Sequence, residues 1–158
     1  MIEAILLIPL ATAFLLYLIR YRRAVELLSV ISSFITMAVA SYLAYVVYIE
    51  GTIDEGLLYM DILSAYVVLL IAFVGLVANL YSVSYMRWEL KEGTIGTIKL
   101  RNYHLCFHLF LFTMALVAVS DNLGIMWIAI EGTTLASAYL VGFYDRATSV
   151  EAAWKYLI

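Results

Sequence analysis

The apolar stretch LGIMWIAIEGTTLASAYLVGFY, residues 123–144, decides the fold class of this chain. About 20 predominantly apolar residues in one helix suffice to cross the hydrocarbon core of a bilayer. Outward from this stretch, the same criterion is met by residues 2–19, 25–49, 62–86 and 103–119. The sequence therefore predicts an all-α, polytopic transmembrane helix bundle with five full spans, which form a single transmembrane domain over residues 1–158.

The overall composition agrees with a membrane protein. Hydrophobic residues make up 66% of the chain, charged residues make up 13%, and the mean hydropathy is +1.01. A soluble domain is roughly half apolar and about a quarter charged. The single cysteine, Cys106, excludes an intrachain disulfide. The first apolar stretch precedes its basic cluster, which is the reverse of a secretory signal peptide, so we expect a retained helix.

The charged residues between the spans predict the orientation of the chain. Basic residues lie in the segments on one side, at Arg20, Arg22, Arg23, Arg87, Lys91, Lys99, Arg101 and Arg146. The segments on the other side contain no Lys or Arg and hold Glu50, Asp54, Glu55, Asp61 and Asp121. Because loops rich in Lys and Arg stay in the cytoplasm, we expect a multi-pass protein of the cell membrane with its N-terminus outside.

Residues 149–158, SVEAAWKYLI, predict the start of a sixth helix. Thr148 and Glu151 have the spacing of a capping box. A helix from Ser149 to Ile158 is only about 15 Å long, so it would end near the bilayer centre with unsatisfied carbonyl groups. We therefore expect more protein around Ile158, either a continuation of the chain or a second polypeptide.

Glu131 is the sharpest candidate for a functional residue. It lies ten residues after Asp121, which places it about 15 Å along a helix and hence near the bilayer centre. A carboxylate there costs at least about 2.5 kcal/mol, and intramembrane acids usually face an internal cavity on an ion or proton pathway. The alternative is a buried glutamate that is hydrogen-bonded to Ser or Thr of a neighbouring helix.

Lys155 is the basic residue that lies inside the sixth predicted helix. Its depth differs from that of Glu131 by about 10 Å at 1.5 Å per residue, so a direct ion pair between them is not expected. Coupling between the two through water remains one interpretation. The local alternative is that Lys155 pairs with Glu151, at the favourable i,i+4 spacing.

Two histidines, His104 and His108, share one face of the fourth span. A proton-relay role for His108 would use the titration of histidine near neutral pH. The alternatives are a pair of satisfied core histidines or half of a metal site, which would need three or four ligands. Asn79 in the third span is expected to bond between helices, and Asp61 is expected to cap the start of that span. We predict no metal site and no cofactor.

Residues 121–158 strongly resemble the antiporter-like membrane subunits of respiratory complex I, the Mrp cation/proton antiporters and the group 4 membrane-bound hydrogenases. The matching features are Asp-Asn-Leu before the fifth span, Trp127 four residues before Glu131, the sequence LVGFY, and EAAWKY on the sixth helix. Upstream, Asp61 with Ser64 and the sequence YSVSYM are similar more loosely. The hydrogenase-4 component F type is the most similar form, and this chain matches only its N-terminal third.

The resemblance implies that Glu131 is central to a proton or sodium pathway and that Lys155 matches a lysine of the family. The family's lysine partner for the glutamate lies on a seventh helix, beyond Ile158. The expected function is therefore an antiporter-like subunit that contributes to proton or sodium translocation in a redox-driven membrane complex, such as a hydrogenase or a complex I relative.

Under this interpretation the chain is not catalytic itself, and Glu131, Lys155, Glu151 and His108 carry the ion. Its expected partners are the lipid bilayer and other membrane subunits of a multisubunit complex, with no nucleic acid. Two alternatives stay open, namely a structural membrane subunit that transports nothing and part of an Mrp-type cation/proton antiporter.

Overall fold

The computed structural model describes residues 1–144 and 146–158, which form six helices and one short hairpin. The helices are α1 (Glu3–Leu18), α2 (Arg22–Glu50), α3 (Ile62–Lys91), α4 (Thr97–Val119), α5 (Leu123–Val141) and α6 (Ala147–Leu157). Strands β1 (Ile53–Asp54) and β2 (Tyr59–Met60) pair antiparallel between α2 and α3.

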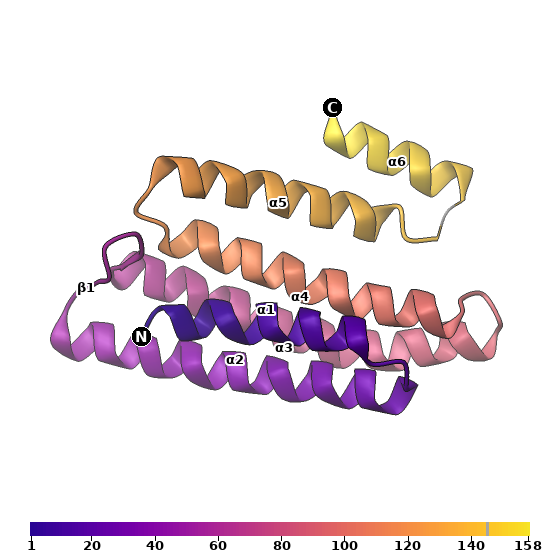
Figure 1. The fold of residues 1–158 in the computed structure, drawn as a ribbon, viewed down its shortest axis with the longest axis horizontal. Coiled ribbons are helices and arrows are strands. Elements are labelled where there is room, and N and C mark those ends of the chain that lie inside the picture. The colour runs from indigo at the N-terminus through magenta and orange to yellow at the C-terminus, as the bar shows by residue number, and fades with distance from the viewer. Residues whose placement is uncertain (145) are drawn as a thin grey trace.

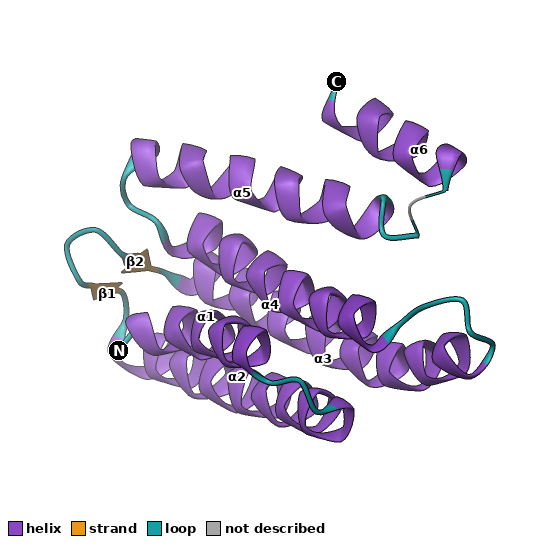
Figure 2. Cartoon of the chain, turned by 45° about the vertical axis from the view of Figure 1, so that its right-hand side comes forward, coloured by secondary structure: helices purple, strands orange, loops and turns teal. Residues whose placement is uncertain are grey.

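The first four helices pack side by side, and α5 lies along the outer side of α4 (Figures 1 and 2). Helix α4 is central in this arrangement, because it contacts α1, α2, α3 and α5. Helix α6 contacts α5 and turns back over it at the edge of the molecule. This arrangement leaves most of α5 uncovered, with only Ala129 and Ala138 buried along its length.

The predicted helical membrane bundle is confirmed. Helices α2, α3, α4 and α5 are each long and apolar enough to cross a membrane. Helix α1 is apolar but has 16 residues, so it is about 24 Å long against a hydrocarbon core of about 30 Å. The first predicted span, residues 2–19, is therefore represented by a shorter helix.

Side-chain caps begin two of these helices. Asp61 Oδ1 accepts a hydrogen bond of 2.7 Å from the Ser64 N–H at the start of α3, as the sequence predicted. This bond lowers the pKa of the Asp61 carboxyl. At the start of α5, Asn122 Oδ1 accepts from the N–H groups of Gly124 and Ile125. Both caps satisfy donors that the first helical turn leaves unpaired.

The predicted cap of α6 is wrong. Thr148 lies inside the helix, which begins at Ala147. Ser149, rather than Glu151, reaches back to Arg146, since its hydroxyl oxygen accepts from the Arg146 N–H at 3.0 Å and its O–H donates to the Arg146 carbonyl oxygen at 2.9 Å. The Glu151 carboxylate is engaged by Lys155 instead.

The hairpin is tied to the start of the chain by Glu55. Its carboxylate accepts from the Met1 amino group and, at 3.1 Å, from the Ile2 N–H. The Met1 ammonium is the main reason that the pKa of Glu55 is lowered. Gly56 has φ +77 in the tight turn between the strands, a conformation that favours glycine.

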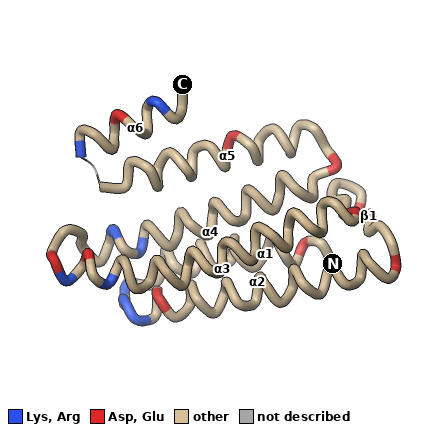
Figure 3. Tube along the Cα trace, turned by 180° about the vertical axis from the view of Figure 1, so that it is seen from behind, with Lys and Arg blue, Asp and Glu red and all other residues tan. Residues whose placement is uncertain are grey.

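Most charged residues lie at the two ends of the bundle (Figure 3). The basic residues of the α1–α2 and α3–α4 connections lie at the same end. The opposite end carries the hairpin and the acidic residues around it. The middle of the bundle is apolar, apart from the polar groups described next.

Candidate ion-translocation site

Glu131 lies near the middle of α5, eight residues after its first residue. It is exposed on the surface of the chain, where it lines a shallow depression of about 280 Å³ with Trp127, Ile128, Gly132 and Leu135. In the described part of the chain, its carboxylate makes no hydrogen bond or ion pair. The predicted internal cavity around Glu131 is therefore not formed by residues 1–144 and 146–158.

The direction of Glu131 follows from how α5 packs on α4. A Cβ atom added at Gly132 would lie 3.0 Å from Thr113 Cγ2 on α4, so the two helices approach closely at Gly132. The residue before it, Glu131, is turned by about 100° around the helix. The carboxylate therefore points along the uncovered side of α5.

Lys155 and Glu151 form the ion pair that their spacing predicted. Lys155 Nζ lies 2.6 Å from Glu151 Oε1, one turn apart on α6. Both side chains are largely exposed. Helix α6 approaches α5 at Gly142, where an added Cβ would lie 3.4 Å from Ala153 Cβ. This contact does not bring the Lys155–Glu151 pair to Glu131.

A buried polar cluster lies inside the bundle and includes His108. We call it the Ser29 cluster; its members are Ser29 and Ser33 of α2, Asn79 of α3, and His104 and His108 of α4. Each member is at most 1% exposed. Asn79 bonds between helices, as predicted, because its Nδ2 donates to the Ser29 carbonyl oxygen at 3.0 Å and to Ser33 Oγ at 2.7 Å.

The hydrogen bonds of Ser29 assign the histidine tautomers. The Ser29 hydroxyl lies 3.1 Å from Asn79 Oδ1, which can only accept, so Ser29 donates its one proton there. His104 Nδ1 and His108 Nε2 each lie 3.0 Å from the same oxygen. Both imidazoles must therefore donate to Ser29, which leaves His104 Nε2 and His108 Nδ1 as acceptors in the neutral rings.

These two nitrogens are buried and have no hydrogen-bond partner among the described residues. A bare imidazole nitrogen accepts a proton or a hydrogen bond from a donor. The Ser29 cluster thus contains two unpaired hydrogen-bond acceptors inside the bundle. No group of three or more His, Cys, Asp or Glu residues that could hold a metal ion occurs within residues 1–144 and 146–158.

Glu26 is a buried carboxylate that the sequence analysis missed. It is 3% exposed and pairs with Arg22 Nε at 3.0 Å and with Arg87 at 2.8 Å. Since Glu26 precedes Ser29 by three residues on α2, both lie on one face of the helix. The Arg22 pair was visible as an i,i+4 spacing, but the Arg87 pair depends on how α2 packs against α3.

Comparison with known proteins agrees with the predicted resemblance. The family model for the NADH-ubiquinone oxidoreductase (complex I) chain 5 N-terminus matches residues 56–92. These residues include β2 and all of α3. A hydrogenase-4 component F homolog from Methylacidiphilum infernorum is 32% identical over 155 residues, which is 98% of this chain and 32% of the relative.

Two further relatives match about two thirds of the chain. NADH-quinone oxidoreductase subunit L of Mycobacterium tuberculosis is 36% identical over 65% of this chain and 15% of its own length. Na(+)/H(+) antiporter subunit A1 of Staphylococcus haemolyticus is 34% identical over 64% of this chain and 12% of its own length. The chain therefore spans about a third or less of these relatives.

These matches identify the class of protein. This chain is a helical membrane protein similar to the antiporter-like subunits of complex I, Mrp antiporters and membrane-bound hydrogenases. The similarity to a hydrogenase-4 component F homolog extends over almost the whole chain. The resemblance predicted from residues 121–158 is thereby confirmed.

Proposed function

We propose that this chain is part of an antiporter-like subunit that contributes to proton or sodium translocation in a redox-driven membrane complex. The chemistry of electron transfer would take place in other subunits. The observation that carries the proposal is Glu131, a carboxylate in the middle of an apolar helix that is long enough to span a membrane. The names of the relatives, which include a Na(+)/H(+) antiporter subunit, support it.

The exposure of Glu131 supports a site that is completed by other protein. Its neighbours on the uncovered side of α5 are apolar, and Trp127 is 72% exposed. A charged carboxylate facing lipid at this depth is costly. A neighbouring helix with a basic side chain would offset this cost, and movement of that charge would change the affinity of Glu131 for its ion.

The proposal gives different roles to His108 and to the Lys155–Glu151 pair. The bare nitrogen of His108 offers an unpaired acceptor for a proton donor inside the bundle. The Lys155–Glu151 pair on α6 is an exchangeable ion pair, in which Glu151 can release Lys155 to another carboxylate. The described residues of this chain do not connect these groups to Glu131, so a pathway between them would need water or other protein.

The proposed membrane placement has five full spans and the N-terminus outside. Helix α1 would span with the help of Ile2 and Ile19, which flank it and extend its apolar length. The clustering of the loop arginines and lysines at one end of the bundle supports the orientation.

A structural subunit that transports nothing is the second candidate. The observation in its favour is that the described residues form no polar connection between Glu131 and the Ser29 cluster. In that case Glu131 would be a hydrogen-bonded anchor for a neighbouring subunit.

The variant Glu131→Gln distinguishes the two candidates. The amide keeps the size and hydrogen bonding of the side chain but loses its titratable charge. We expect an assembled complex whose ion pumping in vesicles is severely impaired, measured together with its redox turnover. Pumping that stays unchanged at unchanged turnover would instead support the structural subunit. The matched control is Glu3→Gln, which removes an exposed carboxylate at the end of α1.

A further inference from the structure

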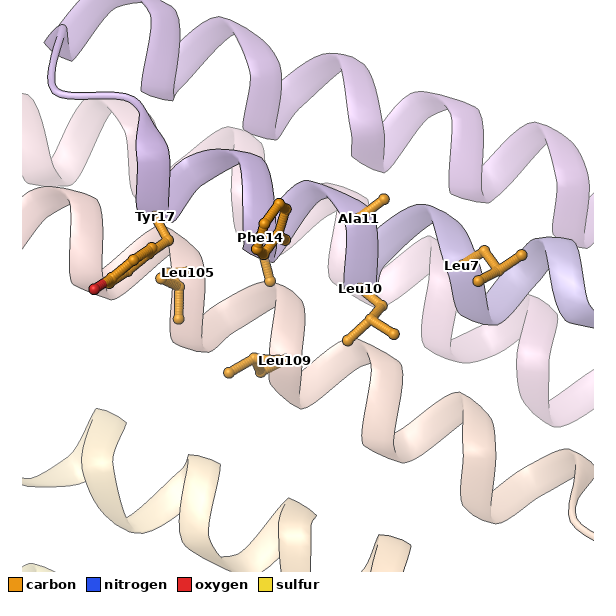
Figure 4. A pocket seen from close by; sticks show the side chains of 8 residues that line it. Leu7, Leu10, Ala11, Phe14, Tyr17, Leu105 and Leu109 are labelled. Atoms are coloured by element: carbon orange, nitrogen blue, oxygen red, sulfur yellow. The ribbon is translucent and has the colours of Figure 1, made fainter.

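An apolar groove runs along the outer face of the bundle between α1 and α4 (Figure 4). Its volume is about 530 Å³. It is lined by six residues of α1 from Leu7 to Tyr17, together with Leu105 and Leu109 of α4. Figure 4 shows Tyr17 at one end of the groove and Leu7 at the other, with Phe14 and Leu10 between them.

The length of the groove matches one leaflet of a bilayer. Leu7 and Tyr17 are ten residues apart on α1, which corresponds to about 15 Å along the helix. Half of a hydrocarbon core of about 30 Å is the same length. The groove can therefore hold an acyl chain over the full depth of one leaflet.

A basic pocket adjoins the Tyr17 end of the groove. It has a volume of about 420 Å³ and is lined by Arg20, Thr97, Ile98 and Arg101. The Arg101 guanidinium lies 5.7 Å from the centre of the Tyr17 ring. Arg101, Leu105 and Leu109 are four residues apart in turn, so they lie on one face of α4. The groove and the pocket thus adjoin where Arg101 lies over Tyr17.

The two arginines of this pocket have no carboxylate partner in the described part of the chain. Arg101 donates only to the Asn102 side chain and to the Tyr17 carbonyl oxygen. By contrast, Arg22 and Arg87 at the same end of the bundle share the carboxylate of Glu26. The charge of Arg20 and Arg101 is therefore available to an anion.

We propose that the α1–α4 groove and its basic pocket bind an anionic phospholipid. The phosphate is held by Arg20 and Arg101, since guanidinium groups pair with phosphate through two parallel hydrogen bonds. One acyl chain lies along the groove from Tyr17 towards Leu7. Basic pockets between membrane helices are typical sites for anionic head groups. The proposal does not depend on the role of Glu131.

Native mass spectrometry of the complex, purified from its own membranes, tests the head-group site. Phosphatidylglycerol and phosphatidylcholine with the same acyl chains are added in turn. We expect a preference for phosphatidylglycerol, which weakens about fivefold for each arginine removed in Arg20→Gln and Arg101→Gln, the effect of one basic residue beside an anionic lipid. The control Arg23→Gln/Lys91→Gln removes two exposed charges from the same end and should keep the preference. Equal losses in the double variant Arg20→Gln/Arg101→Gln and in the control, or no loss in either, would overturn the proposal.

The groove itself is tested in the native membrane. Phe14, which is 65% exposed and lines the groove, is replaced by the photoreactive residue p-benzoylphenylalanine. We expect an adduct with the mass of a phospholipid, and a dominant adduct with another protein would overturn the proposal. The variant Ala11→Trp fills the groove without changing any charge, so it should weaken phosphatidylglycerol binding as well. Unchanged binding by Ala11→Trp would show that no acyl chain occupies the groove.

Discussion

At Ser29, one hydroxyl group satisfies three polar groups from two other helices. It donates to Asn79 and accepts from both His104 and His108. Each of these partners is completely buried. A buried polar group that loses its partner costs about 1–3 kcal/mol, so this small side chain has a large share in the stability of the bundle.

The variant Ser29→Ala should lower the free energy of unfolding by about 1–3 kcal/mol, because it leaves two buried imidazole N–H groups without a partner. It also removes the shorter of the two hydrogen bonds to Asn79 Oδ1, the other being donated by Ser82. The control is Ser41→Ala on the same helix, where the hydroxyl is exposed and bonds only to the Met37 carbonyl oxygen. That control should stay within about 0.5 kcal/mol of the wild type. Denaturant unfolding in detergent measures both, and equal stabilities would contradict the role assigned to Ser29.

Some single residues could be predicted from the sequence and others could not. Asp61, Asn79 and the Lys155–Glu151 pair were found because their roles depend on local spacing or on being polar within an apolar run. Ser29 was not found, since a serine in a transmembrane helix is also typical of simple close packing. Its partners are 50 to 79 residues away in the sequence, and no periodic pattern connects them.

At the scale of the helices, α5 is held to α4 through small side chains. Gly132 brings the backbone of α5 close to Thr113, and Ala129 and Ala138 are the buried residues of the helix. Close packing at small residues is a common way for membrane helices to associate. The helix that these small residues face could only be learned from the packing.

The variant Gly132→Val should weaken the contact between α4 and α5. Thr113 is β-branched and turns poorly to make room, so the added side chain costs about 1–3 kcal/mol through overpacking. Helix propensity works in the opposite direction, since valine is a better helix former than glycine. A loss of stability would therefore come from the packing against Thr113 and not from helix propensity.

Hydrogen exchange of the α5 amides measures this effect, and we expect faster exchange in Gly132→Val. The control Leu135→Val places the same β-branched residue on the exposed side of α5. Equal protection of α5 in the two variants would show that α4 and α5 do not need the close approach at Gly132.

For the molecule as a whole, the number and order of the helices could be predicted because each apolar run must fit the thickness of a bilayer. The ends of the helices differ from those of the predicted spans. Helix α1 is shorter than the predicted span, and α5 ends at Val141 rather than at Tyr144. The surroundings of Glu131 could not be predicted, because they depend on contacts outside the run in which it lies.

The proposed orientation places Asp54 outside and Thr94 in the cytoplasm. Both residues are exposed at opposite ends of the bundle. In a background with Cys106→Ala, we expect that a membrane-impermeant maleimide labels Asp54→Cys in intact cells and that Thr94→Cys reacts only after the membrane is opened. Labelling of position 94 but not of position 54 in intact cells would reverse the orientation.

Helix α2 is held at two points, by Glu26 near its start and by Ser29 one turn further along. Together these contacts fix the rotation of α2 about its own axis. Each residue turns an α-helix by about 100°. If one residue were inserted between Glu26 and Ser29, the helix could keep Arg87 on Glu26 or the two histidines on Ser29, but not both. An insertion or deletion between Glu26 and Ser29 should therefore be tolerated less well than a substitution at the exposed positions 27 and 31 on the same helix.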